Sequence, residues 1–213
     1  MNTRLRGLYA ITDSALIAPD KLIEEVAQAI AGGAAVIQYR DKGTDAARRE
    51  CEARGLLTLC RAHGVPLIIN DDVALAAAIG ADGVHLGRDD ITLNEARRRL
   101  GTAALIGVSC YNDLARAEVA QAAGADYVAF GRFFGSHTKP NAVRAGVELL
   151  HQARQRLDIP VAAIGGITAE NGAALIEASA DMLAVIHGVF GQTDITGAAR
   201  SIALLFKPQM IQL

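Results

Sequence analysis

The sequence predicts an α/β fold, namely a (β/α)8 TIM barrel that forms a single domain over residues 1–213. Three observations favour this fold: short apolar runs recur along the chain, segments with helical spacing lie between them, and related turn sequences precede several of the runs. The runs lack clean alternation of apolar and polar residues, so they are typical of parallel strands that are buried on both faces. Eight such runs with helical segments between them match the barrel.

The expected strands recur at intervals of roughly 25 residues. Between the first two, Leu22, Val26 and Ile30 stand at helical spacing and predict an amphipathic helix. Before the seventh strand, Val147 and Leu150 indicate another. In chain order, the eight expected strands are 8–11, 34–37, 67–69, 83–86, 104–108, 127–130, 161–164 and 182–186.

Related turn sequences precede four of these strands. They are Gly32-Gly33, Gly80-Ala81-Asp82, Gly124-Ala125-Asp126 and Ser179-Ala180-Asp181. A glycine after a helix can adopt the left-handed conformation that ends the helix, and the short polar residue then leads into the next strand. A solenoid would need leucine-rich signatures, which are missing. An open doubly wound sheet is the structural alternative, but no G-x-G-x-x-G motif follows the first strand.

Composition limits the classes of function. The 213 residues are 51% hydrophobic and carry a formal charge of −2, so we expect no nucleic-acid partner. No apolar run approaches the roughly 20 residues of a membrane span, and the first residues lack an apolar signal core, so we expect a cytoplasmic protein without a membrane partner. The three cysteines lack CxxC spacing and an even count, which argues against a disulfide framework; Cys51 and Cys60 are expected to pack against other helices.

Active sites of such barrels lie where the strands end, so the polar residues directly after each apolar run are the candidates. Gln38, Arg40 and Lys42 stand at alternate positions after the second run. In an extended chain, alternate residues share one side, so an amide, a guanidinium and an ammonium point toward one place. This trio suits an anionic ligand.

Two carboxylates, Asp71 and Asp90, follow the third and fourth runs and are expected to be neighbours. Mg²⁺ usually takes one or two carboxylates and leaves its other positions to water and phosphate oxygens. An Asp after a strand also often caps the next helix. The residues alone therefore leave metal binding and helix capping open for both, whereas Asp72 and Asp89 are expected to be caps or solvated.

Two further loops suit phosphate. Segment 131–140 contains hydroxyls, glycines and Lys139, and is expected to form a flexible lid. Phe133 and Phe134 within it would be costly on an exposed loop. Gly165-Gly166 and Ile186-His187-Gly188 follow the seventh and eighth strands, where barrels of this kind usually hold phosphate on backbone N–H groups.

An ordered set of motifs resembles the thiamine-phosphate synthase family. The motifs are QYRDK at 38–42, NDD at 70–72, GVHLGRDD at 83–90, GVS at 107–109, GSHTK at 135–139 and GGIT at 165–168. The resemblance implies a transferase that uses Mg²⁺ and joins 4-amino-2-methyl-5-hydroxymethylpyrimidine diphosphate to a thiazole phosphate by a dissociative mechanism. The products would be thiamine phosphate and pyrophosphate.

The resemblance also assigns residues. It implies catalytic roles for Lys42, Ser109 and Lys139, and Mg²⁺ binding by Asp71 and Asp90. The implied substrate-binding residues are Gln38, Tyr39, Arg40, Asp41, Lys42, Asn70, Ser109, Ser136, His137, Thr138, Lys139, Gly166, Ile186 and His187.

The sequence departs from the family pattern at residues 88 and 187, and Ser136-His137-Thr138 varies a hydroxyl-x-hydroxyl motif by placing His in its middle. Residue 88 is Arg where Gln is common, and residue 187 is His where a small hydroxyl residue is more usual, which leaves the side-chain role at 187 open. Two alternatives remain, a thiazole tautomerase and a noncatalytic barrel that binds phosphorylated metabolites. Neither explains Lys42 and Lys139 beside the two carboxylates. We expect His85 to be a packed, hydrogen-bonded core residue, and the sequence leaves open whether the chain forms a homo-oligomer.

Overall fold

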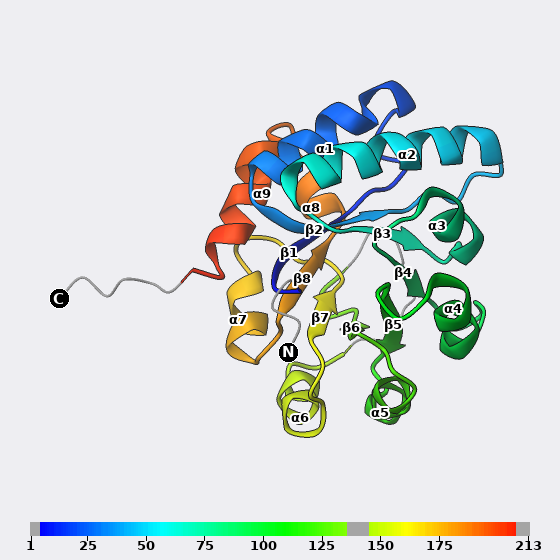
Figure 1. Ribbon diagram of the computed structural model, residues 1–213. Helices are drawn as coiled ribbons and strands as arrows, with labels where there is room; N and C mark the ends of the chain where they lie inside the picture. Colours follow the sequence, from blue (N-terminus) through cyan, green and yellow to red (C-terminus); the bar gives the residue numbers. More distant parts are fainter. Residues whose placement is uncertain (1–4, 136–144, 208–213) are drawn as a thin grey trace.

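Eight parallel strands close into a barrel in the computed structural model, which describes residues 5–135 and 145–207. Each strand pairs with its neighbour in the chain, and β8 pairs with β1 to complete the ring (Figure 1). The predicted barrel is confirmed, and the open sheet is excluded. The strands are β1 Gly7–Ile11, β2 Ala34–Tyr39, β3 Leu67–Asn70, β4 Gly83–Leu86, β5 Leu105–Tyr111, β6 Tyr127–Gly131, β7 Val161–Ile164 and β8 Met182–Val185.

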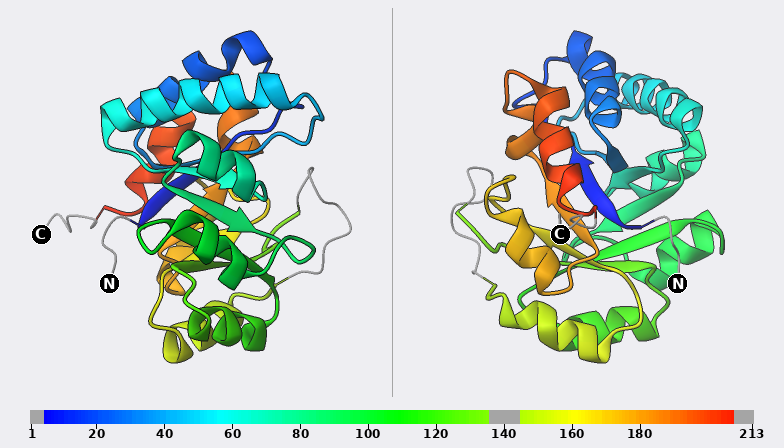
Figure 2. Two further views of the ribbon diagram at one scale, coloured as in Figure 1. Left: turned by 45° about the vertical axis from the view of Figure 1, so that its right-hand side comes forward. Right: turned by 90° about the vertical axis from the view of Figure 1, so that its left-hand side faces the viewer.

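Helices surround the barrel, and α1 packs between α2 and α9 on one side of it (Figure 2). The helices are η1 Pro19–Lys21, α1 Leu22–Ala31, α2 Ala46–His63, α3 Val73–Ile79, α4 Leu93–Leu100, α5 Leu114–Ala122, α6 Glu148–Arg156, α7 Gly172–Glu177, α8 His187–Phe190 and α9 Ile195–Leu204. That a single domain spans 1–213 stays a prediction for the residues outside the described ranges.

The apolar residues form two groups because successive strand residues point to opposite sides. One side packs on the helices, for example Leu8, Ala10 and Ile37. The other side fills the barrel, and its members include Tyr9, Val36 and Ile68. The strands are therefore buried on both faces, which is why their sequences read as continuous apolar runs.

The related turns lie at the amino ends of the strands. Gly80 and Gly124 adopt the predicted left-handed conformation, with φ of 68° and 89°, and Ser179 does so with φ of 81°. The aspartates of these turns do more than lead into a strand, because each accepts a hydrogen bond from the backbone at the start of the preceding strand. The bonds are Leu67 N to Asp82 at 2.9 Å, Ile106 N to Asp126 at 2.8 Å and Val161 N to Asp181 at 2.9 Å.

The expectation for Cys51 is wrong. Cys60 is buried, but Cys51 is exposed, because the inward stripe of α2 runs through Ala53, Leu56 and Cys60 and leaves Cys51 on the opposite side. Within the described part of the chain, no helix is both long and apolar enough to cross a membrane.

Candidate functional site

A cleft of about 310 Å³ opens at the carboxyl ends of the strands. Polar side chains reach it from β2, β3 and β5, and glycine-rich backbone reaches it from the loops after β7 and β8. The predicted site residues that line the cleft are Gln38, Arg40, Asn70, Ser109, Gly166, Ile186 and His187. The candidate loops thus converge on one end of the barrel, as expected from the fold.

Of the 38–42 run, Gln38 and Arg40 line this cleft, Lys42 is not among its lining residues, and two members have side chains that point to α2. The Tyr39 hydroxyl donates to Glu52 of α2 at 2.6 Å, and the Asp41 carboxylate pairs with Arg48 of α2 at 2.7 Å. Their side chains point outward because alternate residues of an extended chain face opposite sides. The side chains of Tyr39 and Asp41 thus connect β2 and its loop to α2, and substrate binding by these two residues stays a prediction that concerns their backbone.

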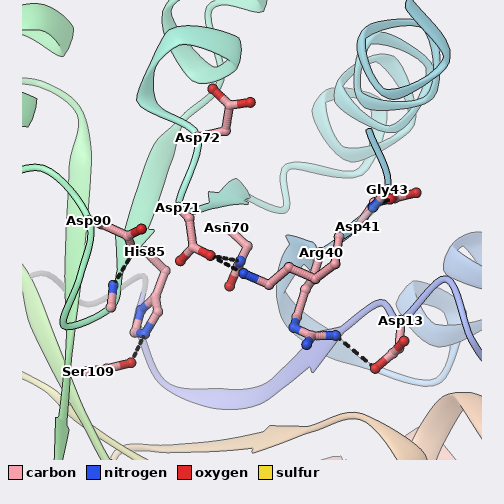
Figure 3. A network of polar contacts seen from close by, with 12 residues as sticks. Asp13, Arg40, Asp41, Gly43, Asn70, Asp71, Asp72, His85, Asp90 and Ser109 are labelled. Carbon is pink, nitrogen blue, oxygen red and sulfur yellow. Dashed lines mark hydrogen bonds and ion pairs between the residues drawn. The ribbon is translucent and has the colours of Figure 1, made fainter. Parts of the chain in front are cut away.

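The two cations of the run are held differently. The Arg40 guanidinium donates to Asp13 at 2.8 Å, and both side chains are largely buried, so the guanidinium has a fixed place (Figure 3). The Lys42 ammonium lies 2.5 Å from a carboxylate oxygen of Asp71, and its side chain is 60% exposed. Lys42 can therefore exchange this partner for an anionic ligand at little cost.

The two predicted metal ligands lie together. Asp71 accepts a hydrogen bond from Asn70 at 2.7 Å, and Asp90 accepts one from the backbone N–H of Gly87 at 2.6 Å (Figure 3). The two carboxyl groups both lie beside Gly87, close enough for each to shift the pKa of the other. Burial and the contact with Asp71 raise the pKa of Asp90. Burial opposes ionisation of Asp71, but the interactions with Lys42 and Asp90 outweigh it and lower the pKa of Asp71. The shifts in opposite directions show that the two carboxyl groups resist being ionised together.

Neither carboxylate caps a helix. Asp72 caps α3 by accepting from Leu75 N at 2.9 Å, and Thr92 caps α4 by accepting from Glu95 N at 3.3 Å. The capping explanation is therefore removed for Asp71 and Asp90, and the expectation that Asp72 is a cap is confirmed. Asp71 also adopts a left-handed φ of 63°, a strained conformation of a kind that clusters at functional sites.

The donor set fits one magnesium ion that is shared with a phosphorylated ligand. Among residues 5–135 and 145–207, no group of three or more His, Cys, Asp and Glu side chains could hold a metal alone. Two carboxylates are what Mg²⁺ takes when phosphate oxygens complete its shell. Gly87 keeps space open here, since a Cβ on it would stand 3.0 Å from Asp90 and 3.9 Å from Asp71.

The loops after β7 and β8 form the other wall of the cleft. Gly166 has φ of 66°, and a Cβ on it would stand 2.0 Å from the carbonyl oxygen of Gly135. Only glycine lets these backbones approach so closely. Ile186 and His187, at the start of α8, face the same space.

Part of the predicted site lies outside the described residues, namely Ser136, His137, Thr138 and Lys139. Residues 136–140 of the expected lid, half of the segment, also lie outside the described residues. Phe133 is buried and Phe134 packs partly on the core, which explains two large apolar residues in this segment. Phe133 N also donates to Ile164 O at 3.1 Å and ties the segment to β7.

Sequence reasoning missed several residues at the cleft. Tyr9 lines it and contacts Tyr127, and Tyr111 lines it under the guanidinium of Arg88, which lies 4.7 Å from the ring centroid. His85 is buried and hydrogen-bonded as expected, but it also lines the cleft. Tyr9 and Tyr127 each place a polar aromatic side chain inside an apolar strand, at a position that faces the barrel interior. That pattern is the signal that could have identified them.

Comparison with known proteins gives consistent matches. Residues 8–189 match the sequence profile of the family described as thiamine monophosphate synthase. The thiamine-phosphate synthase of Azoarcus sp. (strain BH72) is 56% identical over 206 residues, which cover 97% of this chain and 100% of that relative. The thiamine-phosphate synthase of Nitrosococcus oceani is 54% identical over 199 residues, covering 93% of this chain and 92% of that relative.

Solved structures agree on the fold. The thiamine phosphate pyrophosphorylase of Pyrococcus furiosus superposes with a TM-score of 0.85 at 30% identity, covering 96% of this chain and 97% of that one. A 3-hexulose-6-phosphate synthase superposes with a TM-score of 0.70 at 17% identity, over 94% of this chain and 100% of that one, a likeness that shows the fold alone.

Proposed function

The chain belongs to the thiamine monophosphate synthase family, and we propose that it is a transferase that forms thiamine phosphate. It joins 4-amino-2-methyl-5-hydroxymethylpyrimidine diphosphate to 4-methyl-5-(2-phosphoethyl)thiazole, or to the carboxylated form of this thiazole, and releases pyrophosphate. One observation carries the proposal: the cations Arg40 and Lys42 stand at the same rim as the carboxylate pair Asp71 and Asp90. That combination suits a diphosphate with its metal ion.

The diphosphate binds on the side of β2, β3 and β5. Arg40 and Lys42 supply positive charge, Asn70 and Ser109 supply hydrogen-bond donors, and Lys139 adds a further ammonium by resemblance. Asp71 and Asp90 would hold Mg²⁺, which would supply positive charge to the diphosphate when bound.

The chemistry needs no protein nucleophile. The bond between the pyrimidine methylene carbon and the diphosphate oxygen breaks, its electron pair leaves with the diphosphate, and the aminopyrimidine stabilises the resulting cation. The thiazole nitrogen then uses its lone pair to form the new carbon–nitrogen bond. Because negative charge builds up on the leaving group, Arg40 and Lys42 bind it more tightly in the transition state than in the ground state.

The thiazole phosphate binds at the opposite wall, where Gly166, Ile186 and His187 line the cleft. Backbone N–H groups of the loops there suit its phosphate. Two substrates held on opposite walls of one cleft gain rate from fixed orientation. The backbone contacts do not depend on the side chain at 187, so the change from a hydroxyl residue to His leaves the phosphate position intact.

Direct product detection tests this function. The protein is incubated with both phosphorylated halves and Mg²⁺, and thiamine phosphate and pyrophosphate are measured by chromatography with mass detection. We expect both products in equal amounts, and a loss of about a hundredfold or more in rate for Asp71→Asn. Asp72→Asn is the matched control, since Asn still caps α3 and Asp72 is no part of the proposed site.

Two results would overturn the proposal. One is an absence of thiamine phosphate from the wild-type protein, and a tautomerised thiazole as the only product would indicate the alternative enzyme. The other is unchanged turnover in Asp71→Asn, which would remove the metal assignment.

A further inference from the structure

The carboxylate of Asp13 holds the guanidinium of Arg40 at the edge of the cleft. Arg40 Nη1 donates to Asp13 Oδ2 at 2.8 Å, and the two side chains are only 17% and 12% exposed. Arg40 lines the cleft, whereas Asp13 is not among the described residues that line it. Asp13 instead lines a small cavity of about 20 Å³, which Arg40 also borders. The Asp13 side chain therefore contacts the guanidinium without lining the cleft itself.

The loop after β1 fixes the position of this carboxylate. Asp13 Oδ1 accepts a hydrogen bond from Ala15 N at 3.0 Å, and the carbonyl oxygen of Asp13 accepts from Leu16 N at 2.9 Å and from Ile17 N at 3.0 Å. Each carboxylate oxygen thus has its own partner, one in the loop and one on Arg40. Because the turn holds the carboxylate, the hydrogen bond from Arg40 has a fixed acceptor.

The preceding residue, Thr12, holds the backbone of Arg40. Arg40 N donates to Thr12 Oγ1 at 2.9 Å, and Thr12 N donates to Gln38 O at 2.9 Å, which extends the pairing of β1 with β2. Two consecutive residues of one loop thus hold Arg40 at both ends. Figure 3 shows Asp13 on one side of the guanidinium and the Asp71 carboxylate on the other. The guanidinium is therefore held from the side away from the predicted metal ligand.

A carboxylate beside a cation that binds an anion has a cost. An arginine keeps its positive charge in proteins, but the negative charge of Asp13 offsets part of the attraction between Arg40 and a diphosphate. A neutral acceptor would lower the affinity for the anion less. The pair therefore favours a fixed direction of the guanidinium over maximum affinity. Direction matters most in the transition state, when negative charge moves onto the leaving oxygen.

We propose that Asp13 is a positioning residue, which holds the Arg40 guanidinium in the direction that speeds departure of the diphosphate and lowers the affinity for it in return. The inference rests on the function proposed above, in which Arg40 binds the leaving group. It separates two quantities that a purely structural residue would change together. Neutralising Asp13 should lower kcat, whereas it should not weaken the binding of pyrophosphate.

Asp13→Asn tests the inference. An Asn Oδ1 can still accept from Ala15 N and keep the turn, but the amide N–H groups cannot accept from Arg40. We measure kcat for thiamine phosphate formation with both substrates at saturation, and the dissociation constant of pyrophosphate with Mg²⁺ by calorimetry. We expect kcat to fall about tenfold or more. The dissociation constant should decrease or stay within about twofold of the wild-type value.

Asp13→Glu keeps the charge and moves the carboxylate by one methylene group. This variant should have a kcat between those of the wild type and Asp13→Asn, with wild-type affinity for pyrophosphate. It keeps the test decisive where Asp13→Asn folds poorly, which circular dichroism detects.

A double-mutant cycle with Arg40→Gln separates action through Arg40 from action on the fold. The Gln amide keeps an N–H donor for Asp13 but lacks the positive charge. In the Arg40→Gln background, Asp13→Asn should therefore lower kcat by no more than about twofold. Asp72→Asn is the matched control, because Asp72 also pairs with an arginine, Arg49, at 2.9 Å; this variant should keep the wild-type kcat.

Three results would overturn the inference. They are an unchanged kcat in Asp13→Asn, an equal fall in kcat and in the affinity for pyrophosphate, and an equal loss of kcat from Asp13→Asn with and without Arg40→Gln. Each of them leaves the proposed function standing. Absence of thiamine phosphate from the wild-type reaction would instead overturn the function.

Discussion

The ammonium of Lys42 lies 2.5 Å from a carboxylate oxygen of Asp71, and this ion pair joins the loop after β2 to the loop after β3. The Lys42 side chain is largely exposed, so solvent screens the pair and it contributes little to folding. Its significance is positional: it brings a cation and a candidate metal ligand to the same point of the rim.

The first prediction concerns Lys42→Ala. Removing this ammonium should lower kcat/KM by about a hundredfold, because the charge that develops on the leaving diphosphate loses a partner. The free energy of unfolding should change by no more than about 0.5 kcal/mol. Steady-state kinetics and urea unfolding measure the two effects. Lys21→Ala is the matched control, since Lys21 also forms an exposed ion pair, with Glu24 at 3.0 Å, and should keep full activity. A large loss of stability in Lys42→Ala would contradict the positional role.

The second prediction concerns Gly107→Ala. The added Cβ meets the ring of Tyr127, so the variant should lose about 1–3 kcal/mol in its free energy of unfolding. Chemical denaturation measures this change. Gly146→Ala serves as the control, because a Cβ there meets nothing within 4 Å, and it should differ from wild type by no more than about 0.5 kcal/mol. Equal stability of the two variants would mean that Tyr127 is not packed against residue 107.

The third prediction concerns the thiols. Burial raises the pKa of Cys60 and of Cys110 to about 12, whereas Cys51 is exposed. Since the thiolate is the reactive form, a raised pKa leaves about one thiolate in ten thousand at pH 8. An aromatic disulfide reagent at pH 8 should therefore modify one thiol in the folded chain and three after denaturation. Rapid modification of a second thiol in the folded protein, or any rapid modification of Cys51→Ser, would contradict this account.

The fourth prediction concerns Asp41 and pH. Burial opposes ionisation of its carboxyl group, but hydrogen bonds from Arg48 and from the Gly43 backbone outweigh that effect and lower the pKa. A lowered pKa in the folded state gives stability that is present above the unfolded pKa of about 3.9 and is lost as the pH falls through the folded value. Asp41→Asn should therefore be about 2 kcal/mol less stable than wild type at pH 7.

The same comparison at acidic pH completes this test. The difference in free energy of unfolding between wild type and Asp41→Asn should shrink below pH 4, and the KM values at pH 7 should stay close to wild type because Asp41 faces α2. A difference that is independent of pH would contradict the ion pair as its cause.

The barrel could be predicted from the sequence because strands buried on both faces leave a direct signature, a short continuous apolar run. The rim residues followed from the same signature, since a polar residue directly after such a run must lie at the carboxyl end of its strand. Gln38, Asn70 and Ser109 all reach the cleft for this reason. The choice between helix capping and metal binding for Asp71 and Asp90 needed the structure, because only there do Asp72 and Thr92 occupy the caps.

Other features depend on closure of the barrel. Tyr9 and Tyr127 are 118 residues apart, and no local pattern shows that their hydroxyls meet. Because side chains alternate along an extended segment, the sequence alone could have predicted that Tyr39 and Asp41 point away from Gln38 and Arg40. The family resemblance instead assigned all five residues of the 38–42 motif to substrate binding. A role implied by a family motif is therefore best checked, residue by residue, against the direction in which each side chain points.

Magnesium-dependent binding of pyrophosphate, measured by isothermal titration calorimetry, tests most directly whether this rim holds a diphosphate with its metal ion. The wild-type protein should bind pyrophosphate at least about tenfold more tightly with Mg²⁺ than without it, and Asp71→Asn and Asp90→Asn should each lose that gain while Asp72→Asn keeps it. Equal affinity with and without Mg²⁺ in the wild-type protein, or an undiminished gain in both Asp71→Asn and Asp90→Asn, would contradict the account.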